Sequence, residues 1–187
     1  EKESLPFTIR FLLAPETFGS IAYINENLKM LKKNTEGVIV LSCVGDGRKI
    51  SLVRGRKPNK FYSCLRLCSQ SVALEKNLEF SEYDFLERGA DERQYASPHV
   101  SLDVGTLCNT KFSEYPEYHT SADNMSIISE EALSMSAEIV LRTIFFFNEN
   151  EKIVIKDPCE PMFSKFGIYP HTRNYTSTKK SVMNLLN

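Results

Sequence analysis

The sequence predicts an α/β domain with a mostly parallel sheet flanked by helices. Two observations lead to this fold class: strand-like segments alternate with segments of helical period, and residues 37–44 form an almost uninterrupted apolar run. The alternation is typical of βαβ units, and the run is typical of a parallel strand that helices cover on both faces. The chain has 187 residues, of which 42% are hydrophobic and 25% charged. That is enough for one globular domain with its own core.

Each expected element has its own pattern. Residues 7–14 alternate apolar and polar positions and then become continuously apolar, which predicts a strand. Residues 19–33 place apolar side chains on one face and lysines near the end, which predicts an amphipathic helix. The run at 37–44 is the buried strand. Further along, we expect a short edge strand at 49–53, a helix at 62–76, an extended segment at 78–80, a strand at 100–107, a helix capped by Ser129, and a short strand at 153–155.

The domain organisation follows from the same patterns. We assign residues 1–150 to the α/β domain, and residues 151–187, which contain several Pro, Gly, Asn and Thr residues, to a loop-rich C-terminal extension of the same domain. We see no internal repeat and no low-complexity tract.

Charge and cysteine content exclude several classes of function. The net charge of -1 gives no overall field that would recruit nucleic acid or an anionic membrane. No apolar run reaches the roughly 18 residues of a membrane span. The cysteines number five, an odd count without a disulfide framework, which indicates a reducing cytoplasm.

Three potential site segments follow predicted strands. Glu16 comes after the strand at 7–14, Asp46 comes after the strand at 37–44, and Tyr118 and His119 lie in the long loop after the strand at 100–107. Binding sites in parallel sheets collect at the carboxyl ends of the strands. Carboxylates and imidazoles are zinc ligands. We therefore expect Glu16 and His119 to meet at one rim of the sheet and to hold a cation.

Several stretches carry a resemblance to a known family. The chain resembles the zinc aminopeptidases of the bacterial leucyl aminopeptidase type and, more closely, bacterial proteins described as having an aminopeptidase-like domain. The matching stretches are residues 10–23 (RFLLAPETFGSIAY), 37–46 (GVIVLSCVGD), 86–98 (LERGADERQYASP), 114–124 (EYPEYHTSADN) and, more weakly, 159–170 (CEPMFSKFGIYP). The resemblance implies a zinc exopeptidase-like fold. It also implies that this chain is the C-terminal half of a peptidase-like domain from a larger protein.

The resemblance assigns roles to the loop and strand-end residues. The family has two adjacent glutamates, a general base and a metal ligand, where this chain has only Glu16, so Glu16 fills one role or the other. His119 corresponds to a zinc ligand, and Tyr118 corresponds to the tyrosine whose hydroxyl stabilises the oxyanion. Asp123 corresponds to the carboxylate that orients the imidazole.

The resemblance also points to residues whose chemical role is less defined. Asp91 matches the Asp of the family's Gly-Ser-Asp loop, and Arg93 could grip a carboxylate or phosphate; a plain surface charge cluster is the alternative. Ser42 stands where the family has a zinc-binding Asp, and a neutral hydroxyl is a poor zinc ligand. Asp46, four residues further on, could reach the metal site instead. The alternative is that it is an exposed aspartate in a turn. We expect one zinc ion, or a reshaped pair, with the other ligands upstream of Glu1.

These observations favour a zinc-dependent hydrolase that cleaves a peptide N-terminus or another amide, such as an acylated amino sugar. The alternative is a catalytically inactive binding or scaffold domain with an incomplete metal site. A third interpretation is a purely structural domain. The expected partners are a small peptide or acylated amino compound, the missing N-terminal half of the same protein, and a second copy of the chain. Neither nucleic acid nor a membrane is expected.

Overall fold

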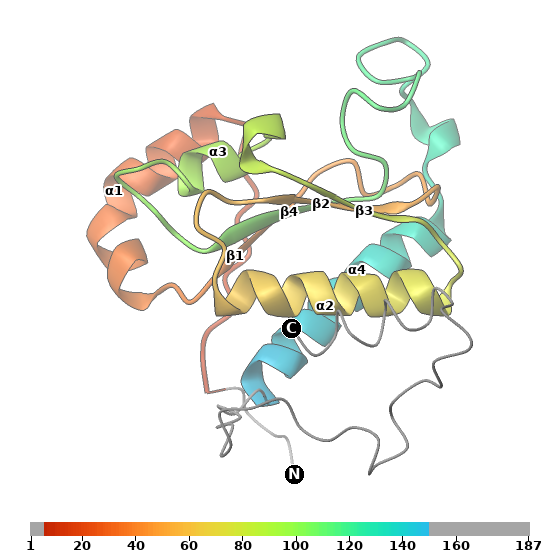
Figure 1. Cartoon of the computed structure of the whole chain (residues 1–187). Helices are drawn as coiled ribbons and strands as arrows, with labels where there is room; N and C mark the ends of the chain where they lie inside the picture. The colour runs from red at the N-terminus through yellow and green to blue at the C-terminus, as the bar shows by residue number, and fades with distance from the viewer. Residues whose placement is uncertain (1–5, 150–187) are drawn as a thin grey trace, which may run out of the picture. The chain divides into compact units, whose positions relative to one another are not determined.

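A mixed four-stranded sheet lies between two layers of helices in the computed structural model, which describes residues 6–149 (Figure 1). These residues belong to the first of two compact units, Glu1–Glu151. The strands are β1 (Val38–Leu41), β2 (Ile50–Arg54), β3 (Phe80–Tyr83) and β4 (Val104–Cys108). The helices are α1 (Phe18–Asn34), α2 (Lys60–Glu75), α3 (Glu92–Tyr95) and α4 (Glu130–Glu149), with short 3-10 turns at Phe85–Glu87 and Met125–Ile127. The predicted α/β fold class is confirmed.

The sheet order β1-β4-β2-β3 decides where the loops meet. The pairs β1–β4 and β2–β3 are parallel, whereas β2 and β4 are antiparallel. Because β1 and β4 run in the same direction side by side, their carboxyl ends lie at one edge of the sheet. The loop after β1 and the loop after β4 therefore leave the sheet as neighbours.

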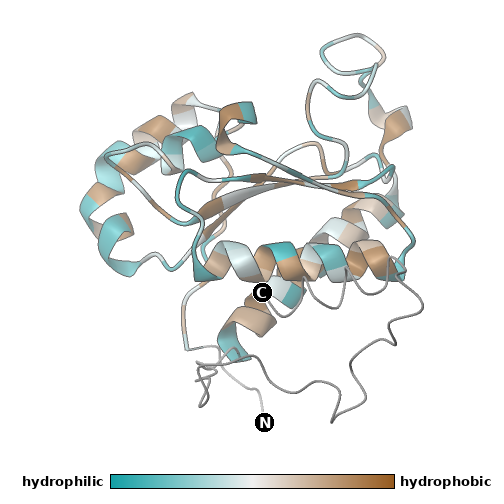
Figure 2. Ribbon diagram, in the orientation of Figure 1, coloured by the Kyte–Doolittle hydropathy of each residue, from teal (hydrophilic) through white to brown (hydrophobic). Residues whose placement is uncertain are grey.

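Two apolar cores cover the two faces of the sheet. One core joins β2 to α2 and α4 through Ile50, Leu52, Leu65 and Ile139, all with no exposed surface. The other joins α1 to the segment before β4 through Ile24, Leu31, Val100, Leu102 and Val104. Figure 2 shows apolar residues interspersed with polar ones along α2 and α4, which lie on the same side of the sheet. Each amphipathic helix buries its apolar face, which supplies most of its stability.

The predicted helices are confirmed within a few residues of their expected ends. The last turn of α1 carries Lys32 and Lys33, cations that complement the negative end of the helix dipole. Ser129 caps α4, since its Oγ accepts a hydrogen bond from the backbone N–H of Ala132 at 3.1 Å. Glutamates in the first turn of α4 complement its positive end.

The predicted strand at residues 7–14 is wrong. In the described part of the chain this segment pairs with no strand, and Phe11 and Leu13 are 85% and 97% exposed. An alternating pattern shows that a segment suits a pleated surface, but a strand also needs a neighbour that accepts and donates its backbone hydrogen bonds. No strand of the described sheet provides that neighbour.

Two predicted strand environments are also wrong. The segment at 49–53 was expected at an edge, yet β2 lies between β4 and β3 and Ile50, Leu52 and Val53 are fully buried. The run at 37–44 was expected to be covered on both sides, yet β1 is an edge strand of the described sheet and Leu41 is 54% exposed. Apolar content is a poor guide to strand order, because order depends on crossovers that the local pattern does not contain.

Some predictions concern residues outside the described range. The strand at 153–155 and the extension at 151–187 are among them. Within residues 6–149, none of the helices combines the length and apolar character that crossing a membrane requires.

Candidate functional site

Tyr118 lies at the centre of the candidate site, in the loop after β4. Its ring packs against an apolar cluster of Val53, Ala90, Cys108 and Phe112. Burial raises the pKa of the Tyr118 hydroxyl, and the nearby Cys43, Glu16 and Asp123 groups raise it further. Glu16, which precedes α1, is therefore within electrostatic reach of Tyr118. A tyrosine hydroxyl is protonated at neutral pH even without such a shift, so Tyr118 can donate a hydrogen bond.

His119 lies against the face of Tyr118. The two rings are stacked, with centroids 3.9 Å apart and an angle of 14° between the planes. The side chain of His119 is exposed. His119 thus contacts Tyr118 directly, whereas the exposed Glu16 is linked to Tyr118 through the effect of its charge on the Tyr118 pKa.

Tyr115 links the loop after β4 to the loop after β1. It was not among the candidates predicted from the sequence. Its hydroxyl lies 3.5 Å from Cys43 Sγ and 3.3 Å from Asp123 Oδ2, so it shares its proton between the two acceptors. Its ring meets Tyr118 edge to face, with centroids 5.5 Å apart. Burial raises the pKa of Tyr115, and Cys43 and Asp123 add to the effect. Asp123 therefore lies against Tyr115, and the only sequence signal was the pair of tyrosines three positions apart.

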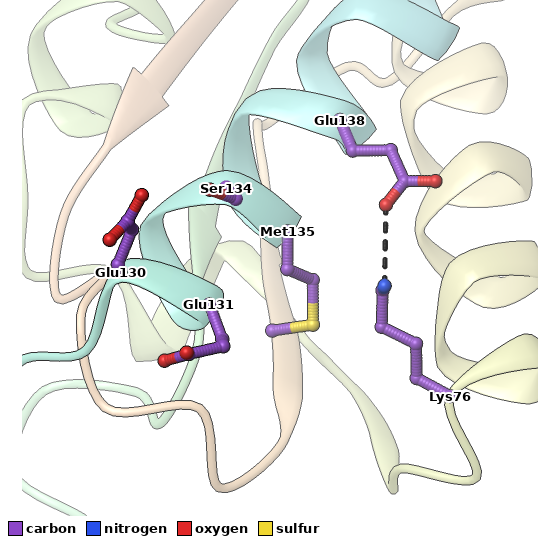
Figure 3. Close-up of a pocket in the computed structure, with 6 residues that line it drawn as sticks. All are labelled: Lys76, Glu130, Glu131, Ser134, Met135 and Glu138. Atoms are coloured by element: carbon purple, nitrogen blue, oxygen red, sulfur yellow. Dashed lines mark ion pairs between the residues drawn. The ribbon is translucent and has the colours of Figure 1, made fainter.

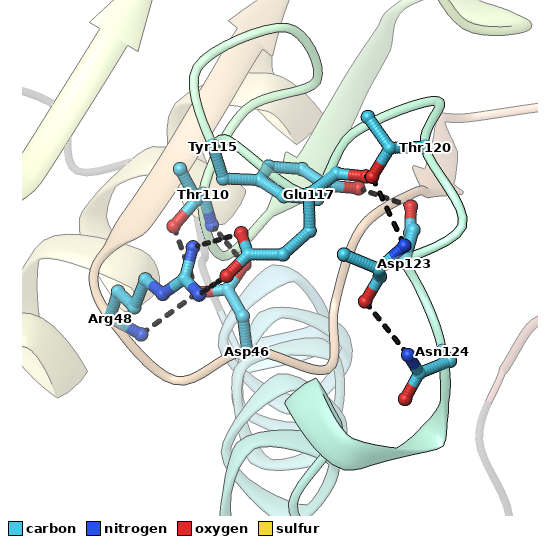
Figure 4. Close-up of polar contacts among 9 residues, drawn as sticks. Asp46, Arg48, Thr110, Tyr115, Glu117, Thr120, Asp123 and Asn124 are labelled. Carbon is cyan, nitrogen blue, oxygen red and sulfur yellow. Dashed lines mark hydrogen bonds and ion pairs between the residues drawn. The ribbon is translucent and has the colours of Figure 1, made fainter.

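Asp46 joins the loop after β1 to the loop after β4 (Figure 4). Its Oδ1 accepts hydrogen bonds from the Arg48 backbone N–H at 2.9 Å and the Thr110 hydroxyl at 2.8 Å, and its Oδ2 accepts from the Thr110 N–H at 3.0 Å. Beside it, the Arg48 guanidinium donates to both carboxylate oxygens of Glu117, at 2.8 and 3.0 Å. The Asp46 carboxylate is thus occupied in holding the two loops together.

Asp91 and Arg93 contact the segment that follows Glu16. Asp91 accepts hydrogen bonds from the Thr17 N–H and the Ser20 hydroxyl, each at 2.7 Å. The Arg93 guanidinium donates to the Thr17 hydroxyl. The structure therefore brings both residues to the site, where their polar groups bind the chain itself.

Glu92 anchors this loop to the sheet and was also missed. Its side chain has no exposed surface. Its Oε1 accepts hydrogen bonds from the backbone N–H groups of Gly89 at 2.8 Å and Ala90 at 3.2 Å, and its Oε2 accepts from the Thr106 hydroxyl at 2.6 Å. Three donors satisfy the buried carboxylate, as a buried charge requires. In the sequence it is one of three adjacent charged residues, and nothing there distinguishes it.

The backbone is strained at three points around the site. Thr17, Cys43 and His119 have φ values of 65°, 53° and 57°, in a region that side chains other than glycine seldom adopt. Such residues persist where their surroundings hold them, and they concentrate at functional sites. Each lies at or beside a residue already assigned to this site.

The described residues do not form a zinc site by themselves. Within residues 6–149, no three His, Cys, Asp or Glu side chains are grouped so that they could hold a metal ion. The carboxylates of Asp46 and Asp91 bind loop backbone and hydroxyl groups, and Ser42 supplies a neutral hydroxyl. Glu16 and His119 remain as candidate donors, and a structural or catalytic zinc takes at least three protein ligands.

A depression of about 330 Å³ lies elsewhere, at the start of α4 (Figure 3). Lys76 and Glu138 form an ion pair of 3.4 Å across it. The other lining residues are Glu130, Glu131, Ser134 and Met135. None of these is a candidate site residue, and apart from Ser134 and the buried Met135 the lining consists of charged side chains.

Similar proteins carry aminopeptidase names. A curated Clostridium acetobutylicum protein, named as a proposed polysaccharide biosynthesis protein with an aminopeptidase-like domain, is 34% identical over 165 residues, which is 87% of this chain and 37% of that protein. The chain thus spans little more than a third of that relative's length. The crystal structure of a proposed peptidase from the same organism matches with a TM-score of 0.66 and 26% identity, covering 92% of this chain and 45% of the other.

A more distant structure shows the same fold. A zinc aminopeptidase from Bacillus subtilis matches with a TM-score of 0.54 and 16% identity, over 75% of this chain and 35% of the other. Residues 1–150 match the family described as "Domain of unknown function (DUF4910)". A curated relative of the chain has an aminopeptidase-like domain, and by the family match the chain belongs to the DUF4910 family.

Proposed function

We propose that this protein is a peptidase-like hydrolase that cleaves a peptide N-terminus or another amide, with Glu16 and Tyr118 as its catalytic residues. The observation that carries the proposal is the packing of Tyr118, whose ring stacks on His119 at 3.9 Å and lies against the apolar cluster beside the strand ends; burial raises the Tyr118 pKa, and the charge of Glu16 adds to that rise. We propose that these two segments, which are far apart in the sequence, bring the carboxylate and the phenol to the same site. The aminopeptidase names of the relatives support an amide substrate.

This pair suits the two charge movements of amide hydrolysis. Water attacks the carbonyl carbon, and the carbonyl oxygen gains negative charge in the tetrahedral intermediate. A carboxylate such as Glu16 can accept the proton that the attacking water loses and return it to the amide nitrogen, which leaves as the amine when the C–N bond breaks. The Tyr118 hydroxyl can donate a hydrogen bond to the oxyanion. The third candidate, His119, stacks on Tyr118 and limits the orientations of its ring.

The relation to longer relatives is part of the proposal. We propose, from the resemblance of its sequence stretches, that the chain corresponds to the C-terminal half of a peptidase-like domain of the leucyl aminopeptidase type; its coverage of 37% and 45% of two relatives supports a match to part of a longer protein. Any zinc would then need donors beyond the described residues, because those residues do not group three potential ligands. Completion by such a segment, or by a second copy of the chain, follows from the same proposal.

A specific observation favours a second candidate function. The carboxylates of Asp46 and Asp91 are committed to structural hydrogen bonds, and Ser42 replaces an acidic residue of the resembling enzymes. A domain of this kind could bind an amide-containing compound without hydrolysing it. Binding without turnover is the property that separates the two functions.

The experiment compares hydrolysis and binding in the full-length protein, which includes any metal donors that lie beyond the described residues. Release of 4-nitroaniline from leucyl-4-nitroanilide is measured with and without added zinc, and leucinamide binding is measured by calorimetry. Removing an oxyanion donor lowers kcat by roughly 10²–10³, and removing a general base lowers it by roughly 10²–10⁴. Tyr118→Phe and Glu16→Gln should show these losses. Tyr83→Phe is the matched control, because the Tyr83 hydroxyl bonds Lys49 and Glu114 outside the pair.

The outcomes separate the candidates. Hydrolysis that both site variants lose and the control keeps supports the hydrolase. Binding of leucinamide without hydrolysis, weakened by Tyr118→Phe, supports the binding domain. If the wild-type protein does neither in either metal condition, both functions are wrong.

A further inference from the structure

The residue after Glu16 has an unusual conformation. Thr17 has φ 65° and ψ -66°, and the Phe18 N–H donates to the Glu16 carbonyl at 2.7 Å. These values define a classic γ-turn, which is rare and strained, and a β-branched residue at positive φ is a marked outlier. The turn lies between Glu16 and the first residue of α1. Its geometry therefore sets the position of Glu16 relative to the helix.

Contacts from a distant loop hold this turn. Asp91 accepts the Thr17 N–H with one carboxylate oxygen and the Ser20 hydroxyl with the other, each at 2.7 Å. Arg93 donates to the Thr17 hydroxyl. Thr17 makes no side-chain cap of its own helix. Asp91 therefore binds the N-cap residue Thr17 from outside α1, and its negative charge complements the positive end of the helix dipole.

The loop that carries these residues is itself rigidly attached. Between them lies Glu92, whose buried carboxylate binds Thr106 on β4. A continuous path thus runs from the central part of the sheet through Glu92 to Asp91 and on to Thr17. A strained turn persists only where its surroundings over-determine it, and this path supplies that determination.

We propose that Asp91 and Arg93 are positioning residues for Glu16: they hold the γ-turn at Thr17 and so fix where the Glu16 carboxylate lies relative to Tyr118. The proposal rests on the hydrolase function above and adds a role for two residues that contact the protein rather than the substrate. It departs from the sequence expectation that Arg93 grips a carboxylate or phosphate.

The test uses a closely matched pair of aspartates. Asp103 binds the start of α2 as Asp91 binds the start of α1: it accepts the N–H groups of the N-cap residue Asn59 at 3.1 Å and of Tyr62 at 3.2 Å. Asp91→Ala, Asp91→Asn and Asp103→Ala are made in the full chain. Amide hydrogen exchange at Thr17 is measured by NMR without substrate, and kcat and KM are measured with leucyl-4-nitroanilide.

Asp91→Ala should speed exchange at Thr17 by about tenfold or more, because it removes a hydrogen bond to a charged acceptor. It should also lower kcat with little change in KM, because the base is misplaced while the substrate still binds. Asp91→Asn should restore both, since its amide oxygen can accept the Thr17 N–H and its NH₂ can donate to Ser20. Asp103→Ala should leave Thr17 exchange and kcat unchanged.

Two results would overturn the inference: unchanged exchange at Thr17 in Asp91→Ala, or fast exchange with a normal kcat. A kcat loss that Asp91→Asn does not restore would also count against it, because it would indicate a role for the charge itself. Exchange is read without substrate. If the wild-type protein does not hydrolyse the substrate, the proposed function is refuted. The exchange data would still decide whether Asp91 holds the turn at Thr17.

Discussion

Glu92 allows a stability prediction worked directly from the contacts. Glu92→Ala removes the acceptor of three hydrogen bonds. Ala90 and Thr106 are buried, so their donors lose their partners, whereas Gly89 is half-buried and its N–H can reach water. Each buried donor left without a partner costs about 1–3 kcal/mol. Relief of the buried charge offsets part of this, so we expect a net loss of about 2–4 kcal/mol.

Glu92→Gln is the sharper variant. Its carbonyl oxygen can still accept the two N–H groups, and the Thr106 hydroxyl can turn to accept from the new amide. We expect a loss of about 1 kcal/mol, the difference between charged and neutral acceptors. The order of stability should therefore be wild type, Glu92→Gln, Glu92→Ala.

Urea unfolding followed by far-UV circular dichroism at pH 7 measures these differences. Glu36→Ala is the control, because Glu36 is exposed and exposed substitutions usually change stability by less than about 0.5 kcal/mol. If Glu92→Ala also unfolds within about 0.5 kcal/mol of the wild type, the reasoning about the buried carboxylate is refuted.

Two further predictions concern the contacts of α2, first with α4 and then with β4. Hydrogen bonding to Arg142 lowers the pKa of Glu75 from 4.5 to about 2, so the stabilisation from this pair is present above pH 4.5 and is lost as pH falls toward 2. Arg142→Met should flatten the acid decline of Tm in that window; an unchanged decline would contradict this. In Gly105→Ala, the new Cβ would lie 2.7 Å from the ring of Tyr62. Urea unfolding should show a loss of about 1–3 kcal/mol, and an unchanged midpoint would show that the ring moves freely.

The elements with a strong helical period could be predicted from the sequence. Residues 19–33 and the segment after Ser129 have apolar stripes and end charges that stabilise a helix wherever it packs. The strands were harder. The pattern of residues 7–14 describes one side of a ladder and cannot say whether a partner strand is present. The burial of β2 results from its place between two other strands, a property of the whole sheet.

The candidate site could be predicted only in part. The order of strand ends predicted that Glu16 and His119 would meet at one rim of the sheet, but the strand at residues 7–14 that was to place Glu16 there is absent from the described sheet, so this meeting stays a prediction. The γ-turn at Thr17 could not be predicted, because threonine disfavours positive φ and the contacts that hold it there come from Asp91 and Arg93, which are distant in the sequence. The Tyr115 bridge depends in the same way on two loops meeting after the chain has folded.

The most direct test of the account is a double-mutant cycle on kcat/KM with Glu16→Gln, Tyr118→Phe and the double variant. Residues that act as one unit lose their effect together, so the losses should be far from additive. The account predicts that the double variant hydrolyses leucyl-4-nitroanilide about as slowly as the slower single variant. Losses that multiply as independent effects, or single variants with wild-type rates, would contradict the claim that this carboxylate and this phenol work as a pair.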